Sequence, residues 1–390
     1  MAGQSLGAKF RQLTASKDGA GLHKLLRSTE GGKPTEKDLQ GAGANDVVAD
    51  VARAWRTGAT PEGLEARCAA LRQWCDRYLA QKDAARWMLP PLLWLAARPR
   101  QLAGELDASC AGAGRHQEKL VEALREQFQK LQREREKREG ALAVCCELLR
   151  LYFKLGQASQ CTFLLSAVHQ ASSKQGGLDL GSLPKALAVT LYYLWGKHCV
   201  LDGNVVEGEE KLGWALANCP PAASGNRRRI LAYLVPCRLR LGRFPVRGVL
   251  EKNGLSSLAG VSAAIATGNV RRFSQELEKH EGELIDCGTY LVVEKLKLVA
   301  YRNLVRRVHG RLAAQLDAQN KAEHRHKQDL AVYEHAFLWQ DDCSPDETVC
   351  LLAHLIYIGA IRGYLSDEHR KVVFSKDSPF PPVSSWCPKA

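Results

Sequence analysis

The chain contains few residue patterns that could support catalysis. Gly112 and Gly114 begin like a dinucleotide-binding loop, but Gln117 stands where the third glycine is needed, and no strand is predicted before them. The sequence has no Walker loop, no H-E-x-x-H helix and no Cys-x-x-Cys pair. These observations predict that the protein is not an enzyme and uses no cofactor.

Histidine and cysteine side chains in the last quarter of the chain could be drawn as metal ligands. The candidates are His324, His326, His335 and Cys343. Their spacing matches no closed zinc pattern, so we expect no metal. The neighbouring Cys145 and Cys146 are expected in the core. The sequence has 13 cysteines and no recognisable signal-peptide segment, so we expect free thiols in a reducing compartment.

Positive charge is the strongest chemical signal in the sequence. The 390 residues include 55 Lys plus Arg and 42 Asp plus Glu, which gives a formal net charge of +13. Within 224–311 there are 17 basic and 7 acidic residues, so this segment carries most of the excess. Such a surface suits phosphate contacts, which are independent of base sequence and sensitive to salt. A basic face that binds acidic protein partners is the alternative.

A helix predicted at about 291–312 would hold part of this charge. Its expected buried face has apolar residues at three- and four-residue spacing, namely Leu298, Tyr301, Val305, Val308 and Leu312. A neighbouring stripe, expected to be exposed, carries Lys295, Arg302, Arg306 and His309. A second group of cations follows near the C-terminus: Arg362, Arg370, Lys371 and Lys376.

The elements that would position these cations have the order of a winged helix. The expected elements are helices at 329–339 and 345–357, a hairpin of 361–365 with 372–375, and a loop or frayed helix at 315–327. The second short helix has a strong start signal, because Ser344 can cap it and Glu347 can complete a capping box. Three helices followed by a hairpin predict a helix-turn-helix with a β wing.

The start of that second short helix argues against reading of DNA bases. In a helix-turn-helix reader this end meets the base edges. Here it carries four acidic residues, Asp341, Asp342, Asp346 and Glu347. Their charges would be repelled by phosphates, so we expect backbone binding, with single strands and RNA left open.

Before the winged helix, the sequence predicts an array of paired helices. Glycines at the expected helix ends recur at Gly156, Gly203, Gly242 and Gly268. One unit, 192–220, fits the tetratricopeptide spacing through Tyr192, Trp195, Gly196, Cys199, Gly208, Leu212, Ala215 and Pro220. The glycine intervals are unequal, so the fold class expected is mainly α, with irregular tetratricopeptide-like repeats followed by a winged helix.

These patterns divide the chain into four expected parts. They are a poorly ordered segment at 1–60 with one short helix near 45–56, a repeat array at 61–285, a winged-helix part at 286–382 and a tail at 383–390. The longest apolar runs fall short of the ~18 residues of a membrane span, so no span is expected.

Six blocks of sequence resemble one family of PCI-domain proteins. They are Arg228–Pro236 (RRILAYLVP), Glu294–Lys297 (EKLK), Tyr301–Leu304 (YRNL), Leu355–Gly359 (LIYIG), Ile361–Tyr364 (IRGY), and Ser375-Lys376 followed by Pro379–Pro382 (PFPP). These blocks resemble the family of PCI domain-containing protein two, whose yeast relative is the PCI subunit of transcription-and-export complex two. The likeness is continuous over about 227–382 and looser over 141–226.

The resemblance implies helical repeats that lead into a winged helix and a non-enzymatic scaffold. It implies two protein partners, a larger PCI-type subunit and a small acidic disordered subunit shared with the proteasome lid. It also implies work in messenger-RNA export at the nuclear pore, hence a nuclear location with the cytoplasm as a second one, and contact with RNA or DNA. The alternative is a purely protein-binding subunit of a signalosome- or proteasome-lid-like assembly.

The candidate nucleic-acid contacts come from two sources. Five cations match the family blocks: Lys295, Lys297, Arg302, Arg362 and Lys376. Four more follow from charge alone: Arg306, Arg307, Arg370 and Lys371.

Overall fold

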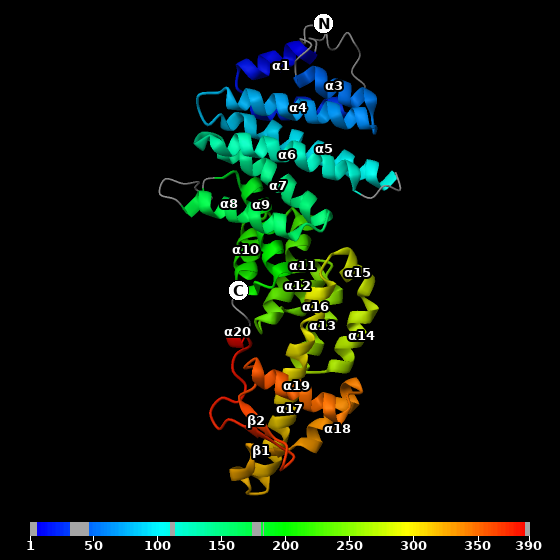
Figure 1. The fold of residues 1–390 in the computed structure, drawn as a ribbon, viewed down its shortest axis with the longest axis vertical. Helices are drawn as coiled ribbons and strands as arrows, with labels where there is room; N and C mark the ends of the chain where they lie inside the picture. Colours follow the sequence, from blue (N-terminus) through cyan, green and yellow to red (C-terminus); the bar gives the residue numbers. More distant parts are fainter. Residues whose placement is uncertain (1–5, 32–46, 110–113, 174–180, 182, 387–390) are drawn as a thin grey trace. The chain divides into compact units, whose positions relative to one another are not determined.

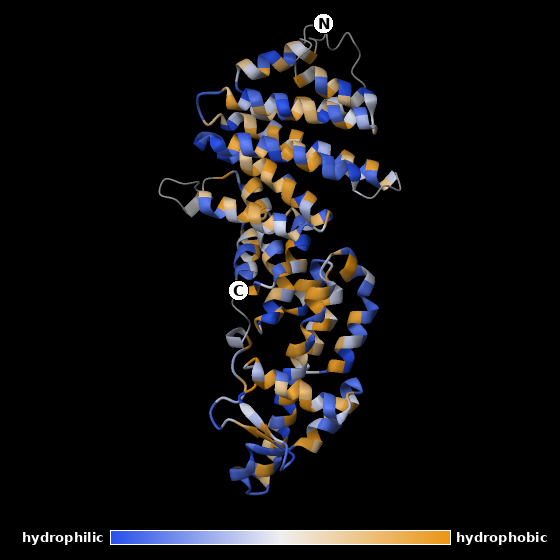
Figure 2. Ribbon diagram, viewed as in Figure 1, coloured by the Kyte–Doolittle hydropathy of each residue, from blue (hydrophilic) through white to orange (hydrophobic). Residues whose placement is uncertain are grey.

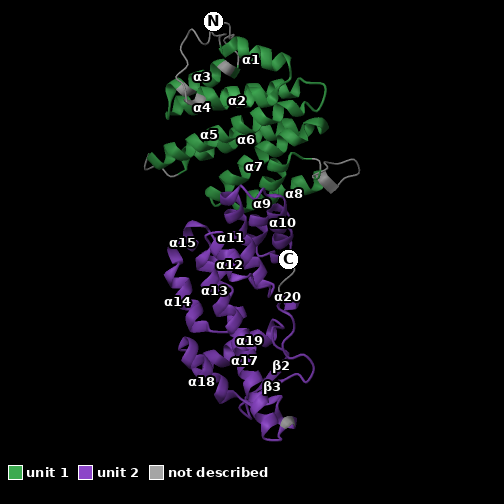
Figure 3. Cartoon of the chain, turned by 180° about the vertical axis from the view of Figure 1, so that it is seen from behind, with its two compact units in different colours: residues 1–194 green, residues 195–390 purple. Residues whose placement is uncertain are grey.

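The computed structural model describes residues 6–31, 47–109, 114–173, 181 and 183–386. The chain divides into two compact units, Met1–Leu194 and Trp195–Ala390 (Figure 3). The expected boundary near residue 285 therefore does not separate compact bodies, because the later repeat helices and the winged helix belong to one unit.

Unit 1 is built from helices (Figure 1). They are α1 Leu6–Ala15, α2 Gly19–Gly31, α3 Val47–Thr57, α4 Pro61–Leu79, η2 Arg86–Met88, α5 Leu89–Ser109, α6 Arg115–Arg133, η3 Arg135–Lys137, α7 Arg138–Lys154, α8 Ala158–Ser173 and the first part of α9, Lys185–Asp202. Local sequence explains the start of α4, because the Thr60 side chain accepts a hydrogen bond from the Gly63 amide and Pro61 fits the first turn.

The described residues among the first sixty are more helical than the sequence predicts. α3 agrees with the short helix expected near 45–56, but α1 and α2 were not expected. Phe10, Leu22 and Leu26 are at most 1% exposed, and the Phe10 ring lies 6.2 Å from that of Trp74 in α4. Packing onto later helices thus stabilises a glycine-rich segment whose own helix propensity is low.

Unit 2 begins with the helices of the repeat array. They are the rest of α9, then α10 Val205–Asn218, α11 Ser224–Arg240, α12 Arg247–Lys252, α13 Ser256–Thr267, α14 Val270–Lys279, α15 Glu281–Asp286 and α16 Tyr290–Glu294. Figure 2 shows α13 as largely hydrophobic, and Leu258, Val261 and Ile265 on it are at most 1% exposed.

The glycine turns are confirmed. Gly156, Gly203, Gly242 and Gly268 all have positive φ, between +63° and +93°. The tetratricopeptide-like spacing also has a physical basis, because a Cβ on Gly196 would lie 2.6 Å from the Leu212 side chain. α9 and α10 can approach this closely only with glycine at that position.

The winged helix follows the repeats. Its elements are α17 Lys297–Ala318, η5 Ala322–His324, β1 Lys327–Asp329, α18 Leu330–Asp341, α19 Pro345–Tyr357, β2 Gly363–Ser366 and β3 Lys371–Phe374. The three strands form one antiparallel sheet in the order β1-β3-β2. The capping box of α19 is present, with the Ser344 hydroxyl accepting from the Glu347 amide.

Two boundaries in this region differ from those expected. The helix at 291–312 is two helices, α16 and α17, and the second continues to Ala318. The segment 315–327 contains the end of α17, η5 and the first residue of β1. β1 was missed because Lys-Gln-Asp has low strand propensity and pairs only with the distant β3.

The last described residues are not a tail. Val383–Trp386 forms α20, and Val383 and Trp386 are each 8% exposed. The Arg240 guanidinium lies 4.9 Å from the Trp386 ring centre, and a Cβ on Gly242 would lie 2.9 Å from the Val383 Cβ. The chain therefore returns from the sheet to the end of α11, while 387–390 lie outside the described residues.

Candidate nucleic-acid interface

The junction of α16 and α17 places two predicted cations. Lys295 caps the C-terminus of α16 and is exposed. Lys297 is half-buried, and its ammonium lies 2.8 Å from the Asp341 carboxylate and 5.6 Å from the Tyr301 ring centre. Lys295 is therefore available to a ligand, whereas Lys297 helps to join α17 to the end of α18.

Arg302 is buried, which corrects the exposed stripe predicted for this helix. The residue is only 3% exposed. Its guanidinium donates to the carbonyl of Pro381 at 2.7 Å and to the Asn303 side chain at 2.9 Å. Desolvation lowers the pKa of Arg302 to about 10, and it remains protonated at neutral pH. Arg302 therefore holds the C-terminal segment and does not present its charge to a nucleic acid, contrary to the sequence prediction.

His309 also departs from the expected stripe. Its ring lies 4.4 Å from that of Phe374 and 5.4 Å from that of Phe380. Burial lowers the pKa of His309. α17 therefore turns part of its basic stripe toward the sheet and the C-terminal segment.

Arg306 and Arg307 remain on the surface of α17. Both are exposed. Arg307 donates to the carbonyl of Thr267 at 2.6 Å, which links α17 to the end of α13. Arg306 has no ion pair within the described residues, so its charge is available to a ligand.

The cations at the tip of the hairpin are exposed but paired. Arg370 contacts Glu334 at 2.5 Å and Asp367 at 3.8 Å. Lys371 contacts Asp329 at 3.0 Å. A phosphate would have to compete with these carboxylates, so the tip offers less net charge than the sequence suggests.

The other end of the sheet gathers basic side chains with fewer acidic partners. We call His324, His326, Lys327 and Lys376 the strand-end cluster. The Phe374 amide donates to the carbonyl of His326 at 2.8 Å, which places the start of β1 beside the end of β3. Burial first, and then the charges of Lys376, Lys327 and His324, lower the pKa of His326. Glu323 is an acidic neighbour, 3.3 Å from His324.

Arg362 lies at this same end of the sheet. It precedes β2, and its carbonyl accepts from the Ser375 amide at 2.8 Å, so it lies opposite the residue before Lys376. Arg362 is exposed and has no ion pair among the described residues. The sequence indicated Arg362 and Lys376, but it missed His326 and Lys327 because β1 was not predicted. Figure 2 shows the region of η5 and β1 as largely hydrophilic.

The acidic residues at the start of α19 are used inside the fold. Asp341 accepts from the Tyr301 hydroxyl and pairs with Lys297. Glu347 accepts from the Ser344 amide at 2.8 Å. They border a cavity of about 480 Å³ that Asp342, Cys343 and Cys350 also line. This negative surface is unsuited to phosphate, as the sequence indicated.

The described residues contain no group of three His, Cys, Asp or Glu side chains placed to hold a metal ion. Cys145 and Cys146 are buried, as expected, and burial raises the pKa of Cys146 to about 12. No described helix is both long and apolar enough to cross a membrane.

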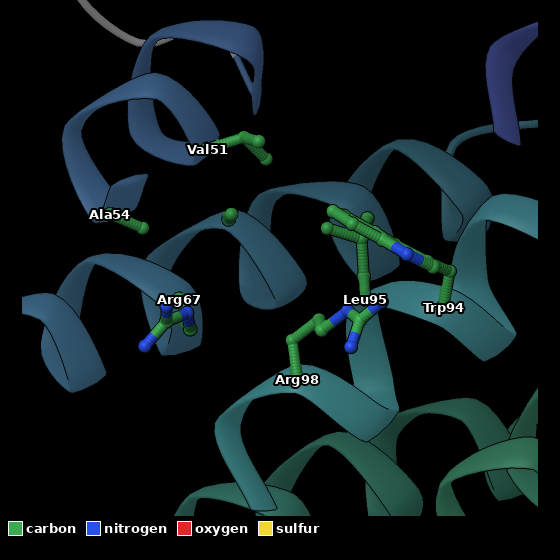
Figure 4. Close-up of a pocket in the computed structure, with 7 residues that line it drawn as sticks. Val51, Ala54, Arg67, Trp94, Leu95 and Arg98 are labelled. Carbon is green, nitrogen blue, oxygen red and sulfur yellow. The ribbon is translucent and has the colours of Figure 1, made fainter. Parts of the chain in front are cut away.

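One cavity of unit 1 is far too small for a substrate. It lies among α3, α4 and α5 and is lined by Val51, Ala54, Arg67, Ala70, Trp94, Leu95 and Arg98 (Figure 4). Its volume is about 10 Å³, about enough for one water molecule.

Helical repeats that continue into a winged helix place this chain in the PCI-domain class of proteins. No family model matches the chain. It is 30% identical to PCI domain-containing protein 2 of Xenopus laevis over 337 residues, which is 84% of this chain and 80% of that protein. It is 33% identical to the PCI domain-containing protein 2 homolog of Drosophila melanogaster over 317 residues, or 79% and 76% of the two chains.

A third relative carries a different name. The chain is 31% identical to the Protein CSN12 homolog of Gibberella zeae over 257 residues, which is 64% of this chain and 56% of that protein. The identities and coverage of the animal relatives show that the chain belongs to the PCI domain-containing protein 2 family.

Proposed function

We propose that this protein is a non-enzymatic scaffold subunit of a transcription-coupled mRNA export complex at the nuclear pore. In this role its winged helix contributes a basic surface that contacts the backbone of RNA or DNA. Its proposed protein partners are a larger PCI-type subunit and a small acidic disordered subunit. Family membership supports the scaffold role, and the proposed location is the nucleus.

The observation that carries the nucleic-acid part is the crowding of positive charge at one end of the sheet. Burial, and then the charges of Lys376, Lys327 and His324, lower the pKa of His326. Lys327 and Lys376 have no ion pair within the described part of the chain. Uncompensated like charges cost free energy unless an anion binds. A phosphate backbone would supply that anion and release its counterions.

A charge-reversal experiment tests this surface. Purified full-length protein is titrated with single-stranded and duplex oligonucleotides at several salt concentrations. Arg362→Glu combined with Lys376→Glu should weaken binding and reduce the salt slope by about 0.7 for each phosphate of a single strand that the protein no longer neutralises. Capture of the larger PCI-type partner should be unchanged.

The matched control is Lys24→Glu with Arg27→Glu. These two cations are exposed on α2 in unit 1, so the change in net charge is the same. If both double variants bind with the same affinity and the same salt slope, the strand-end surface is not the binding site.

A purely protein-binding subunit is the second candidate. The name of the Gibberella zeae relative, Protein CSN12 homolog, favours a signalosome-like assembly. In that case the basic surface would meet acidic protein. Absence of salt-sensitive nucleic-acid binding by the wild-type protein, alone and with its captured partners, would support this candidate and overturn the first.

A further inference from the structure

The outward face of the wing sheet carries an exposed aromatic ring among cations. Residues directly opposite each other on neighbouring strands point to the same face of a sheet. Val373 of β3 lies opposite Lys327 of β1 on one side and opposite Tyr364 of β2 on the other. Lys327, Val373 and Tyr364 therefore form one row across the sheet.

This row lies on the solvent side. The alternate residues Gln328, Val372 and Phe374 are at most 3% exposed, whereas Tyr364 is 59% exposed and Lys327 is exposed. No ring contact of Tyr364 is found among the described residues. Within the described part of the chain, the Tyr364 ring is thus presented to solvent without an aromatic partner.

The charges on this face are not evenly distributed. The next row of this face toward the strand-end cluster contains Arg362 opposite Ser375. Lys376 is exposed at the end of the sheet, beyond the last residue of β3. The row toward the hairpin tip contains Asp329 paired with Lys371, and Asp367 and Glu368 lie beyond it. Tyr364 stands at the border of the cationic end, where the acids are Glu323 beside His324 and Asp377 directly after Lys376.

We propose that the outward face of this sheet binds single-stranded nucleic acid, with a base stacked on Tyr364 and the adjoining phosphates held by Lys327 and Arg362 on that face and by Lys376 at the end of the sheet. This proposal rests on the proposed nucleic-acid function and adds a preference for unpaired strands. Strands in a sheet are ~4.8 Å apart, so Lys327 and Tyr364 lie two strands, or roughly 10 Å, apart. That spacing lets one side chain meet the backbone while the other meets a base.

The preference follows from the chemistry of stacking. A base in a duplex has both faces covered by its neighbours, whereas an unpaired base has a face free for a tyrosine ring. Stacking on an aromatic residue contributes about 1–3 kcal/mol for each base and tolerates any base. A protein partner docked on this face would also depend on Tyr364. Unlike a phosphate backbone, it would not require neighbouring cations that lack carboxylate partners.

The first measurement compares three variants of the full-length protein. Binding of an oligouridylate of about 20 nucleotides, and of a duplex of equal length, is followed by fluorescence anisotropy. Tyr364→Ala should weaken single-strand binding roughly tenfold and leave duplex binding and the salt slope unchanged. Tyr364→Phe should retain the affinity because the ring remains. Tyr357→Ala is the control, since Tyr357 is 89% exposed in the same winged helix.

The second measurement locates the base directly. An oligouridylate with 5-bromouridine is irradiated with the wild-type protein, and the crosslinked residue is identified by mass spectrometry. A crosslink at Tyr364 supports stacking, and a crosslink only at other residues overturns it.

The outcomes separate this inference from the broader function. If wild-type protein binds both oligonucleotides with a salt slope but Tyr364→Ala changes neither, the nucleic-acid function stands and the stacking site is wrong. If wild-type protein binds no nucleic acid, both are wrong. If Tyr364→Ala abolishes capture of the larger PCI-type partner and retains oligouridylate binding, the face is a protein interface and the inference is overturned.

Discussion

Arg302 shows how one residue can satisfy a sequence motif for a reason other than ligand binding. It belongs to the YRNL block and carries a charge, yet it is 3% exposed and bonded to the Pro381 carbonyl. The Phe380 ring centre lies 5.7 Å from its guanidinium carbon. The YRNL and PFPP blocks therefore meet in the fold, and the arginine joins them.

Arg302→Ala should lower the free energy of unfolding of unit 2 by about 2–4 kcal/mol. The substitution removes a buried charged hydrogen bond, leaves the Pro381 carbonyl without its donor and creates a cavity beside Phe380. Urea denaturation measures the change. Arg306→Ala, four residues along α17 and exposed, should change it by less than about 0.5 kcal/mol. Equal stability of the two variants would contradict the joining role.

His326 predicts how nucleic-acid binding depends on pH. In the free protein its lowered pKa keeps it neutral near pH 7. A bound phosphate favours the charged ring and raises that pKa, so binding takes up a proton. The affinity for nucleic acid should rise severalfold as the pH falls from about 7.5 to 6. Uptake of one proton can change that affinity by at most about tenfold per pH unit.

The control for this pH dependence is another histidine of the winged helix. His326→Gln should flatten the pH profile, whereas His335→Gln, an exposed position on α18, should retain it. A profile unchanged by His326→Gln would remove the strand-end cluster from the phosphate site.

At the scale of elements, the capped and glycine-terminated helix ends and the β2–β3 hairpin were predictable, and the pairing of β1 was not. The capping box of α19 and the glycine turns depend on residues within one turn of each helix end. β1 has only three residues, and it exists because β3, more than forty residues later, supplies its hydrogen bonds. The strand-end cluster and the row of Tyr364 therefore depend on a register that no local pattern encodes.

The glycine turns are not energetically equivalent. Gly268 has φ +63°, and a Cβ there would lie 2.4 Å from the backbone nitrogen of Leu304, where α13 meets α17. Gly203 has φ +93° with nothing within 4 Å of such a Cβ. Gly203→Ala should lower the free energy of unfolding by about 1–2 kcal/mol, because alanine is strained in the left-handed backbone conformation.

Gly268→Ala should lower the free energy of unfolding by clearly more than Gly203→Ala, about 3 kcal/mol or above. The backbone at Leu304 must move in addition to the strain of the left-handed conformation. Thermal denaturation of the two variants of unit 2 gives the comparison. If Gly268→Ala were as stable as Gly203→Ala, the close approach of α13 and α17 would not be required by the fold.

At the scale of the whole molecule, the C-terminal segment ties the winged helix to the repeat helices of unit 2. Arg362 donates its amide to the Pro379 carbonyl at 2.9 Å, Arg302 holds Pro381, and Trp386 lies on Arg240 at the end of α11. The segment expected to be a tail thus closes unit 2, and the winged helix shares its compact unit with the later repeats.

Truncation after Ser378 should loosen unit 2 while unit 1 keeps its own core. Amides of α11 and α17 should exchange with solvent at least roughly tenfold faster in hydrogen-exchange mass spectrometry, since Phe380, Val383 and Trp386 no longer pack there. Amides of α4 and α5 serve as the internal reference. Unchanged exchange rates in α11 and α17 would show that the C-terminal segment does not tie the winged helix to the repeat helices of unit 2.

The sequence by itself determined the helical class, the glycine turns, the capped helix and the family, because these depend on short-range periodicity and on contiguous blocks. It did not determine which cations face solvent. Arg302 and Arg306 are one helical turn apart, and only the packing of the C-terminal segment decides that the first is buried and the second exposed. Likewise, Lys327 and Tyr364 are 37 positions apart in sequence and share a row only through β3. Charge is a property of the residue, but its availability to a ligand depends on tertiary contacts that place or remove a counter-charge.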